Sequence, residues 1–402
     1  MLEQRQSHTQ PQVLSDLRGD TRHVYVVGMG QVSALSGEGW GAPGHCLHAV
    51  GNRFVGQVAA HWEPALEALR TSTRQHKRMD RSALLGILAA RQAIAQAAWT
   101  PDELAHCPLF LGSARGPTGN FEAAHRSFLT GEELPPHTSP VTTLAAAAQA
   151  VAWDLGLTGT VADHALTCGS AAFALADGWL WLQSGLSDYL LAGGTEAPLT
   201  DFTAAQLVAL GLLEAHDPDW PCRPFAPKTR NTFALAEGSA LFTLTAADRP
   251  PTGALACLEG FGWGTERASS PAAIDPEGLA LGLAMEHALH RTGRTPADID
   301  AVIAHAPGTI LGDAAERVAI ERLWPQNPPP VTSAKWQIGH PLGASAAQSL
   351  ALAVHLLNGG AYAPPGYPDA PPWPDGFRPR CVLVNATGFG GAACSWVVSA
   401  VD

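Results

Sequence analysis

Short apolar runs alternate along the chain with longer segments in which apolar residues recur every three or four positions. The short runs predict strands at 23–27, 108–111, 188–191, 240–244, 255–259, 301–304, 380–384 and 395–399. The longer segments predict helices at 81–99, 171–184, 276–291, 313–323 and 344–357. Strands that alternate with helices in this way are typical of an α/β fold with a largely parallel sheet.

The order of these elements repeats. HVYVVGMG, PLFLGSARG, TCGSAA and YLLAGGTE mark the first series, and LACLEGFG, AVIAHAPGT, SAKWQIGHPLGASAA and CVLVNATGFGG mark the second. The repeat predicts two similar halves with sheets packed back to back and with loops from both at one central site. We divide the chain into a polar tail (1–22), an N-terminal half (23–250) and a C-terminal half (251–402).

Composition narrows the class of protein. Of 402 residues, 46% are hydrophobic and 15% charged, which predicts a globular protein with a large core. No apolar run is long enough for a membrane span, and the polar start lacks the apolar section of a signal peptide. The formal charge of −12 argues against sequence-independent nucleic-acid binding. Seven cysteines without a CxxC pair indicate reduced thiols in a cytoplasm.

A dinucleotide-binding site is the first alternative to consider. Gly28 and Gly30 follow an apolar run, as in the opening of such a site. The full GxGxxG pattern is absent, however, and no acidic residue stands about 20 positions further on. The sequence therefore argues against this class.

Cys168 is the first candidate for chemistry. It follows a short apolar run and directly precedes an alanine-rich helical segment. A thiol at a helix N-terminus faces unpaired backbone N–H groups and the positive end of the helix dipole, and both are expected to lower its pKa. Taken alone, the residue fits a buried structural cysteine better than a nucleophile.

Three further residues strengthen the case for Cys168. His305 ends a predicted strand, and His340 stands just before a second helix start rich in small residues. Polar residues at strand ends of an α/β sheet face the crevice where ligands bind. Lys335 is one of only three lysines and precedes His340 in a stretch without other charges. The glycine-rich loop 385–391 can bring backbone N–H groups close to a ligand.

Six motifs in order resemble the β-ketoacyl-[acyl-carrier-protein] synthases of the thiolase-like superfamily: TCGSAA, YLLAGGTE, AEGSALFTL, HAPGTILGD, SAKWQIGHPLGA and NATGFGG. The resemblance implies a thiolase-like fold with layered α-β-α-β-α architecture. It also implies a cytoplasmic enzyme without metal or cofactor. Such an enzyme joins an acyl thioester to malonyl-acyl-carrier-protein by decarboxylative condensation. It works as a homodimer or as a heterodimer with a second ketosynthase-like subunit.

The resemblance assigns roles to individual residues. Cys168 would accept the acyl group, and His305 and His340 would activate the malonyl thioester. Lys335 would shape the electrostatics of the site. Phe389 would gate it.

Phe389 lies between Gly388 and Gly390 in the sequence, and the resemblance implies that these three residues serve gating and the oxyanion hole. The backbone N–H groups of Cys168 and Phe389 would form the oxyanion hole. A basic cluster that includes Arg74, Lys77 and Arg78 could receive an acidic carrier protein, although a solvated helix start explains these charges equally well.

The chain departs from the family pattern at several positions. Thr167 stands where alanine is usual, and Gly169 where serine or alanine is common. The family's HGT is extended to HAPGT, and Ser349 replaces a glutamate, which removes one internal charge pairing. These departures point to a divergent branch, similar to the synthases of aryl-polyene or flexirubin-type pigments.

Two other readings remain open. Thiolases share related glycine motifs, but the segment between AGGTE and AEGSALFTL is too short for their loop domain, and the final loop lacks their second cysteine. Chain-length factors are non-catalytic partners of ketosynthases that have lost the nucleophile. The presence of Cys168 here argues against that role.

Overall fold

A computed structural model describes residues 22–97, 99–213, 217–267, 270 and 272–401, so nearly all of the predicted tail lies outside the described residues. Ten strands form one hydrogen-bonded sheet, and β2 (His48–Val50) and β3 (Arg53–Val55) form a separate hairpin. The order in the sheet is β10-β9-β11-β12-β8-β1-β7-β6-β4-β5. These strands are β1 (His23–Val32), β4 (Leu109–Gly112), β5 (Val161–His164), β6 (Tyr189–Glu196), β7 (Gly238–Ala247), β8 (Ala256–Thr265), β9 (Ala301–Ile303), β10 (Val331–Thr332), β11 (Cys381–Gly388) and β12 (Ala392–Ser399).

The two halves predicted from the repeated pattern are present and share one topology. Outward from β1 the strands run β1-β7-β6-β4-β5, and outward from β8 they run β8-β12-β11-β9-β10. In each half the first two pairings are antiparallel and the last two are parallel. Strand β6 therefore corresponds to β11, and β4 to β9. The proposed boundary after residue 250 falls between β7 and β8.

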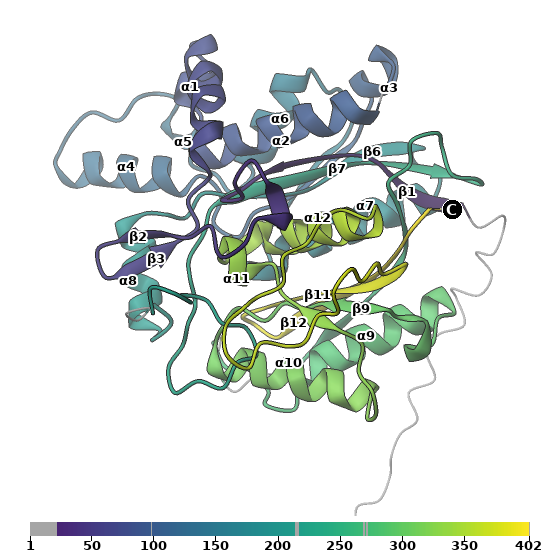
Figure 1. Ribbon diagram of the computed structural model, residues 1–402. Coiled ribbons are helices and arrows are strands. Elements are labelled where there is room, and N and C mark those ends of the chain that lie inside the picture. The colour runs from purple at the N-terminus through teal and green to yellow at the C-terminus, as the bar shows by residue number, and fades with distance from the viewer. Residues whose placement is uncertain (1–21, 98, 214–216, 268–269, 271, 402) are drawn as a thin grey trace, which may run out of the picture.

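The halves join where β1 meets β8. Only three residue pairs connect these strands, from Val24–Leu258 to Val26–Ala256. The two five-stranded sections lie one above the other (Figure 1), so the back-to-back arrangement is present, with this short seam linking the sections.

Helices separate and cover the two sections, which gives the layered α-β-α-β-α architecture (Figure 1). Helices α7 (Ser170–Gln183) and α12 (Ser345–Leu357) lie between them. The N-terminal section is covered by α2 (Arg81–Ala97) and α6 (Ala146–Leu155), and the C-terminal section by α9 (Leu279–Thr292) and α10 (Ile310–Leu323). The remaining helices are α1 (Glu63–Ser72), α3 (Pro101–Ala105), α4 (Thr118–Leu129), α5 (Thr138–Val141), α8 (Asp201–Ala209) and α11 (Lys335–Ile338).

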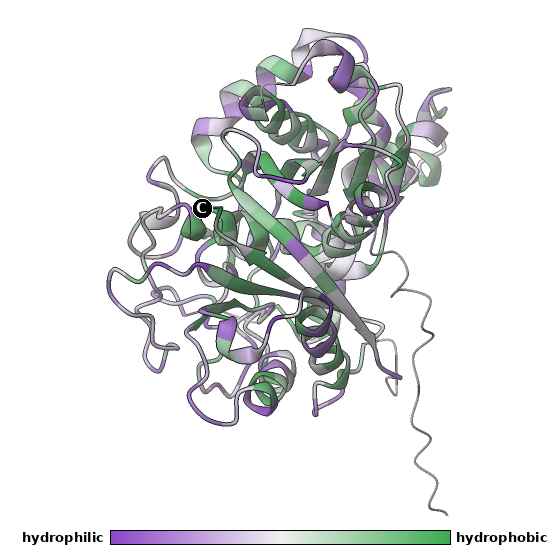
Figure 2. Cartoon of the chain, turned by 90° about the vertical axis from the view of Figure 1, so that its right-hand side faces the viewer, coloured by the Kyte–Doolittle hydropathy of each residue, from purple (hydrophilic) through white to green (hydrophobic). Residues whose placement is uncertain are grey.

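The hydrophobic core follows these layers. One cluster joins both sheet sections through α7 and α12, and two others lie beneath the outer helices of each half. Figure 2 shows the apolar residues concentrated in the strands and the helices between them. Gly28 and Gly30 have a packing role, since a Cβ at either would collide with a carbonyl of α2. Among the described residues, no helix has both the length and the apolar character that a membrane crossing requires.

Candidate active site

One cavity brings together the main residues that the sequence predicts for the site. Cys168 from the N-terminal half and His305, His340 and Phe389 from the C-terminal half all line it. Most of the other lining residues are apolar, among them Leu207, Leu212, Phe233, Leu281 and Leu342. The cavity can therefore receive an apolar chain and present it to a thiol and two imidazoles.

Cys168 lies in a 3₁₀ turn, Thr167–Gly169, that leads directly into α7. Thr167 has a φ of 50°, which is unusual for a β-branched residue. The Ser170 hydroxyl stabilises the turn, because it donates to the Thr167 carbonyl at 2.6 Å and accepts from the Leu166 N–H at 2.9 Å. The half-buried Cys168 is thus presented at the helix N-terminus, as predicted.

The expected lowering of the Cys168 pKa is wrong. Burial raises the pKa of this thiol to about 12, and the charge of Glu196 raises it further. Lys335 acts in the opposite direction but does not compensate. The free-energy cost of removing the thiolate from water is larger than the stabilisation that the charge of Lys335 provides. The resting side chain is therefore the neutral thiol.

His305 follows β9 and is held through its backbone. Glu316 on α10 accepts from the N–H groups of His305 at 2.9 Å and Ala306 at 2.6 Å. Asn385 on β11 donates to the same carboxylate at 3.0 Å and accepts from Ser395 on β12 at 2.8 Å. A chain of buried polar groups therefore fixes the histidine to the sheet.

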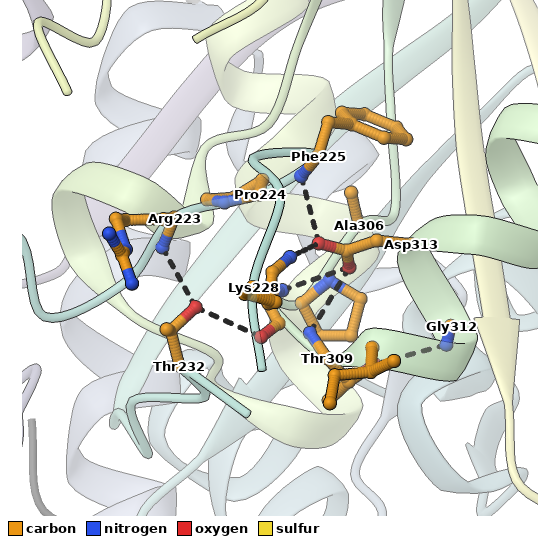
Figure 3. Close-up of polar contacts among 12 residues, drawn as sticks. Arg223, Pro224, Phe225, Lys228, Thr232, Ala306, Thr309, Gly312 and Asp313 are labelled. Carbon is orange, nitrogen blue, oxygen red and sulfur yellow. Dashed lines mark hydrogen bonds and ion pairs between the residues drawn. The ribbon is translucent and has the colours of Figure 1, made fainter. Parts of the chain in front are cut away.

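The HAPGT loop after His305 is held by a second buried carboxylate. Asp313 accepts from the N–H groups of Gly308 at 3.1 Å, Thr309 at 3.2 Å and Phe225 at 2.8 Å. Lys228 forms an ion pair with Asp313, and both side chains are almost fully buried. Figure 3 shows these contacts converging on the carboxylate. The extension of the family's HGT motif is therefore rigidly supported.

His340 is fixed by two backbone hydrogen bonds to a neighbouring segment. Its N–H donates to the Ala234 carbonyl at 2.7 Å, and its carbonyl accepts from the Ala236 N–H at 3.0 Å. The imidazoles of His305 and His340 meet edge to face, with ring centroids 5.2 Å apart. Burial and the charge of Lys335 lower the pKa of both rings well below the ordinary value. Both histidines are therefore neutral at pH 7 and each carries one N–H donor.

Lys335 opens α11 and is 1% exposed. Within the described part of the chain its Nζ has no hydrogen-bond partner, and neither does the Ser349 hydroxyl. Burial lowers the pKa of Lys335 to about 8, although the charge of Glu316 favours the protonated form. The lysine is placed to act on the site by its charge, without a carboxylate fixed to it.

The glycine-rich loop closes one side of the cavity. Gly388 ends β11, Phe389 is half-buried, and Gly390 and Gly391 both have positive φ values. A Cβ on Gly388 would lie 3.1 Å from the Cys168 nitrogen and would collide with the Thr167 hydroxyl. The loop therefore lies directly against the turn that carries the cysteine.

The basic residues Arg74, Lys77 and Arg78 are exposed on the segment before α2. Arg81, the first residue of α2, instead pairs with Glu237 and Glu63. In the described residues no group of three or more His, Cys, Asp or Glu side chains is arranged to hold a metal ion.

One buried carboxylate beside the site was not predicted from the sequence, where it stands only as the last residue of the YLLAGGTE motif. Glu196, at the end of β6, is fully buried and accepts from the backbone N–H groups of Ala114 at 2.7 Å, Gly343 at 3.0 Å and Arg115 at 3.2 Å. Burial raises its pKa to about 7. Its position at the end of the YLLAGGTE strand was the available signal.

Comparisons with known proteins identify the family of the chain. The N-terminal domain of the β-ketoacyl synthases matches residues 48–249, and the C-terminal domain matches 255–365. The tetracenomycin polyketide synthase ketoacyl synthase alpha subunit of Streptomyces glaucescens is 30% identical over 370 residues, covering 85% of each chain. The 3-oxoacyl-[acyl-carrier-protein] synthase 2 of Staphylococcus aureus is 29% identical over 284 residues, 68% of this chain and 70% of that protein.

A solved structure has the same fold. It is a ketosynthase in complex with its chain length factor from Xenorhabdus doucetiae, with a TM-score of 0.76 and 21% identity over 98% of this chain and 100% of that chain. At this identity the likeness establishes the fold alone. Because the two matched domains span most of the sequence, the chain belongs to the β-ketoacyl synthase family of the thiolase-like superfamily.

Proposed function

We propose that this protein is an active β-ketoacyl-[acyl-carrier-protein] synthase. The observation that carries the proposal is the meeting of Cys168, His305 and His340 around one apolar cavity. Each of the three is fixed by its own backbone contacts, so the constellation is preorganised. We expect it to act in the cytoplasm, where its seven free cysteines stay reduced.

The first half-reaction transfers an acyl group to the protein. The Cys168 sulfur attacks the thioester carbonyl of acyl-carrier-protein, the carbonyl carbon bonds to sulfur, and the carrier leaves as its thiol. Since the resting thiol is neutral, its proton must leave as the bond to carbon forms. The negative oxygen of the intermediate would be stabilised by the backbone N–H groups of Cys168 and Phe389.

The second half-reaction uses the two neutral imidazoles. Malonyl-carrier-protein loses carbon dioxide as its C–C bond breaks, and the electron pair forms an enolate on the thioester. The N–H donors of His305 and His340 would stabilise the enolate oxygen. The enolate carbon then attacks the carbonyl carbon of the Cys168 thioester and the C–S bond breaks. The 3-oxoacyl product leaves on the carrier, and the Cys168 sulfur leaves as a thiolate that takes up a proton from solvent to restore the thiol. The lowered pKa values of His305 and His340 favour this step, because each neutral ring can donate one N–H to the enolate oxygen without itself carrying a charge.

The test follows the acyl group and the carbon dioxide separately. We expect incubation with acyl-carrier-protein to add one acyl mass to the intact protein. Cys168→Ala should abolish that adduct, whereas Cys222→Ala, at a buried cysteine outside the lining of the cavity, should retain it. We expect malonyl-carrier-protein to release carbon dioxide, and His305→Ala and His340→Ala to suppress the release. An acyl adduct that persists in Cys168→Ala would overturn the assignment of the nucleophile.

The exposed basic residues Arg74, Lys77 and Arg78 form a docking surface for the acidic carrier in this proposal. Lys77→Glu together with Arg78→Glu should raise KM for carrier-bound substrate by roughly tenfold, since charges at a docking surface act mainly on association. Turnover of a small thioester such as an N-acetylcysteamine derivative should stay unchanged. An equal loss of activity with the carrier-bound substrate and with the small thioester would show that these residues do not dock the carrier.

A chain-length-factor-like partner is the second candidate. The feature that favours it is the raised pKa of Cys168, which keeps the thiol neutral at rest and so lowers its nucleophilicity. The solved relative from Xenorhabdus doucetiae is itself bound to a chain length factor. A partner role predicts that the protein alone forms no adduct, and that Cys168→Ala does not change the activity of a ketosynthase with which it forms a heterodimer.

A further inference from the structure

Two hydrogen bonds hold the glycine-rich loop over the nucleophile. The Thr167 hydroxyl donates to the Phe389 carbonyl at 3.1 Å, and the Glu266 N–H donates to the Gly391 carbonyl at 2.9 Å. Phe389 and Gly388 line the cavity beside Cys168, so the loop is part of its wall. Beyond the β11–β12 pairing at its base, the loop is therefore tied at two points, one of which is the side chain directly before Cys168.

The hydrogen bond from the Thr167 hydroxyl to the Phe389 carbonyl requires both a hydroxyl at position 167 and a glycine at position 388. A Cβ on Gly388 would collide with the Thr167 hydroxyl, so the side chain rests on a surface that only glycine leaves open. The Thr167 backbone is held at a φ of 50° and its carbonyl accepts from the Ser170 hydroxyl, which fixes the direction of the side chain. Valine has the same shape but cannot donate to the Phe389 carbonyl.

We propose that Thr167 is a positioning residue that latches the loop 388–391 and so controls how large a group can reach the Cys168 sulfur. Gly390 and Gly391 adopt positive φ values, and glycine allows such a loop to change conformation at low cost. Loss of the Thr167 hydrogen bond would leave the Phe389 carbonyl free, with the loop still held by Glu266 and by the β11–β12 pairing at its base. The proposal concerns access to the sulfur and does not depend on condensation.

The experiment compares two thiol reagents of different size on three proteins. Iodoacetamide is small, and a maleimide with a bulky aromatic substituent is large. Both react with the thiolate, so the ratio of their rate constants at Cys168 cancels any change in its pKa. Peptide mapping identifies the modified cysteine, and Cys168→Ala provides the blank. The variants are Thr167→Val, which removes only the hydroxyl, and Thr167→Ser, which keeps it.

In Thr167→Val the rate constant of the large reagent, divided by that of the small one, should rise by roughly threefold to tenfold. This is the range expected for the loss of one hydrogen bond between neutral groups. Hydrogen exchange in the peptide that contains residues 388–391 should accelerate in parallel. Thr167→Ser should stay within roughly twofold of the wild type in both measurements. Thr167→Ala should behave as the valine variant does, and it serves in its place if valine does not fold. An unchanged ratio and unchanged exchange in Thr167→Val, or equal changes in valine and serine variants, would overturn the proposal.

Discussion

The buried charge of Lys335 should have a measurable effect on the free energy of unfolding and on its pH dependence. Lys335 is 1% exposed, and its pKa falls from the ordinary 10.5 to about 8 because burial disfavours its charge. One pKa unit corresponds to about 1.4 kcal/mol. The difference of about 2.5 between these two pKa values means that charged Lys335 costs the fold about 3 kcal/mol near pH 7. Lys335→Met should therefore raise the free energy of unfolding by about this amount at pH 7.

The sign and the pH window follow from the same two pKa values. Between pH 8 and 10.5 the unfolded chain holds the Lys335 proton while the folded chain releases it, so wild-type stability gains from rising pH in this range. Lys335→Met lacks this contribution. The gap between variant and wild type should thus shrink from about 3 kcal/mol at pH 7 to about 1 kcal/mol at pH 10.

Urea unfolding of both proteins at pH 7, 8, 9 and 10 measures this gap directly. The matched control is Lys77→Met, the same substitution at an exposed lysine, which should change stability by no more than about 0.5 kcal/mol at each pH. Parallel stability curves for Lys335→Met and wild type across this range would refute the reasoning, because they would mean that Lys335 does not lose its proton near pH 8.

Three further outcomes are expected. Because the pKa of Cys168 is about 12, its alkylation by iodoacetamide should accelerate about tenfold per pH unit from pH 7 to 10, and a plateau below pH 9 would contradict this. Lys228→Met should lower stability by about 3–5 kcal/mol, because it leaves the buried Asp313 without its cation; adding Asp313→Asn should recover part of the loss in urea unfolding. Glu316→Gln places an amide N–H against the backbone N–H groups at His305 and should cost about 1–3 kcal/mol, so an unchanged urea midpoint would be inconsistent with the hydrogen bonds described.

Much of the fold could be predicted because buried strands and amphipathic helices leave strong patterns. All eight predicted strands and five predicted helices are present, with boundaries shifted by a few residues. The edge strand β5 (Val161–His164) was not predicted, because it is short and only partly buried and carries polar residues. The alanine-rich α6 was also missed, since alanine gives little contrast between its two faces.

In the candidate site, too, some features could be predicted from the sequence and others could not. Cys168, His305 and His340 stand in local motifs, and these can be read from a single sequence. The polar chain from Ser395 through Asn385 to Glu316 depends on residues that only the fold brings together. The direction of the Cys168 pKa was predicted wrongly for a related reason, since the helix N-terminus is visible in sequence but desolvation is set by tertiary packing.

The equivalence of the two halves shows why the candidate cavity lies at one helix start and not at its counterpart. The 3₁₀ turn Thr167–Gly169 before α7 corresponds to Leu342–Ala344 before α12, and each begins with a residue of positive φ. Cys168 thus matches Gly343 within the repeat. The strand end that faces Gly343 is Glu196, whose carboxylate accepts from its N–H.

The matching strand end beside Cys168 is Gly388, which has no side chain. One helix start is permanently occupied by a carboxylate from the protein itself, and that contact fastens the N-terminal half to the C-terminal half. The other helix start receives no carboxylate from its strand end, and Cys168 there lines the cavity. The repeated architecture therefore gives a contact between the halves at one helix start and a wall of the cavity at the other.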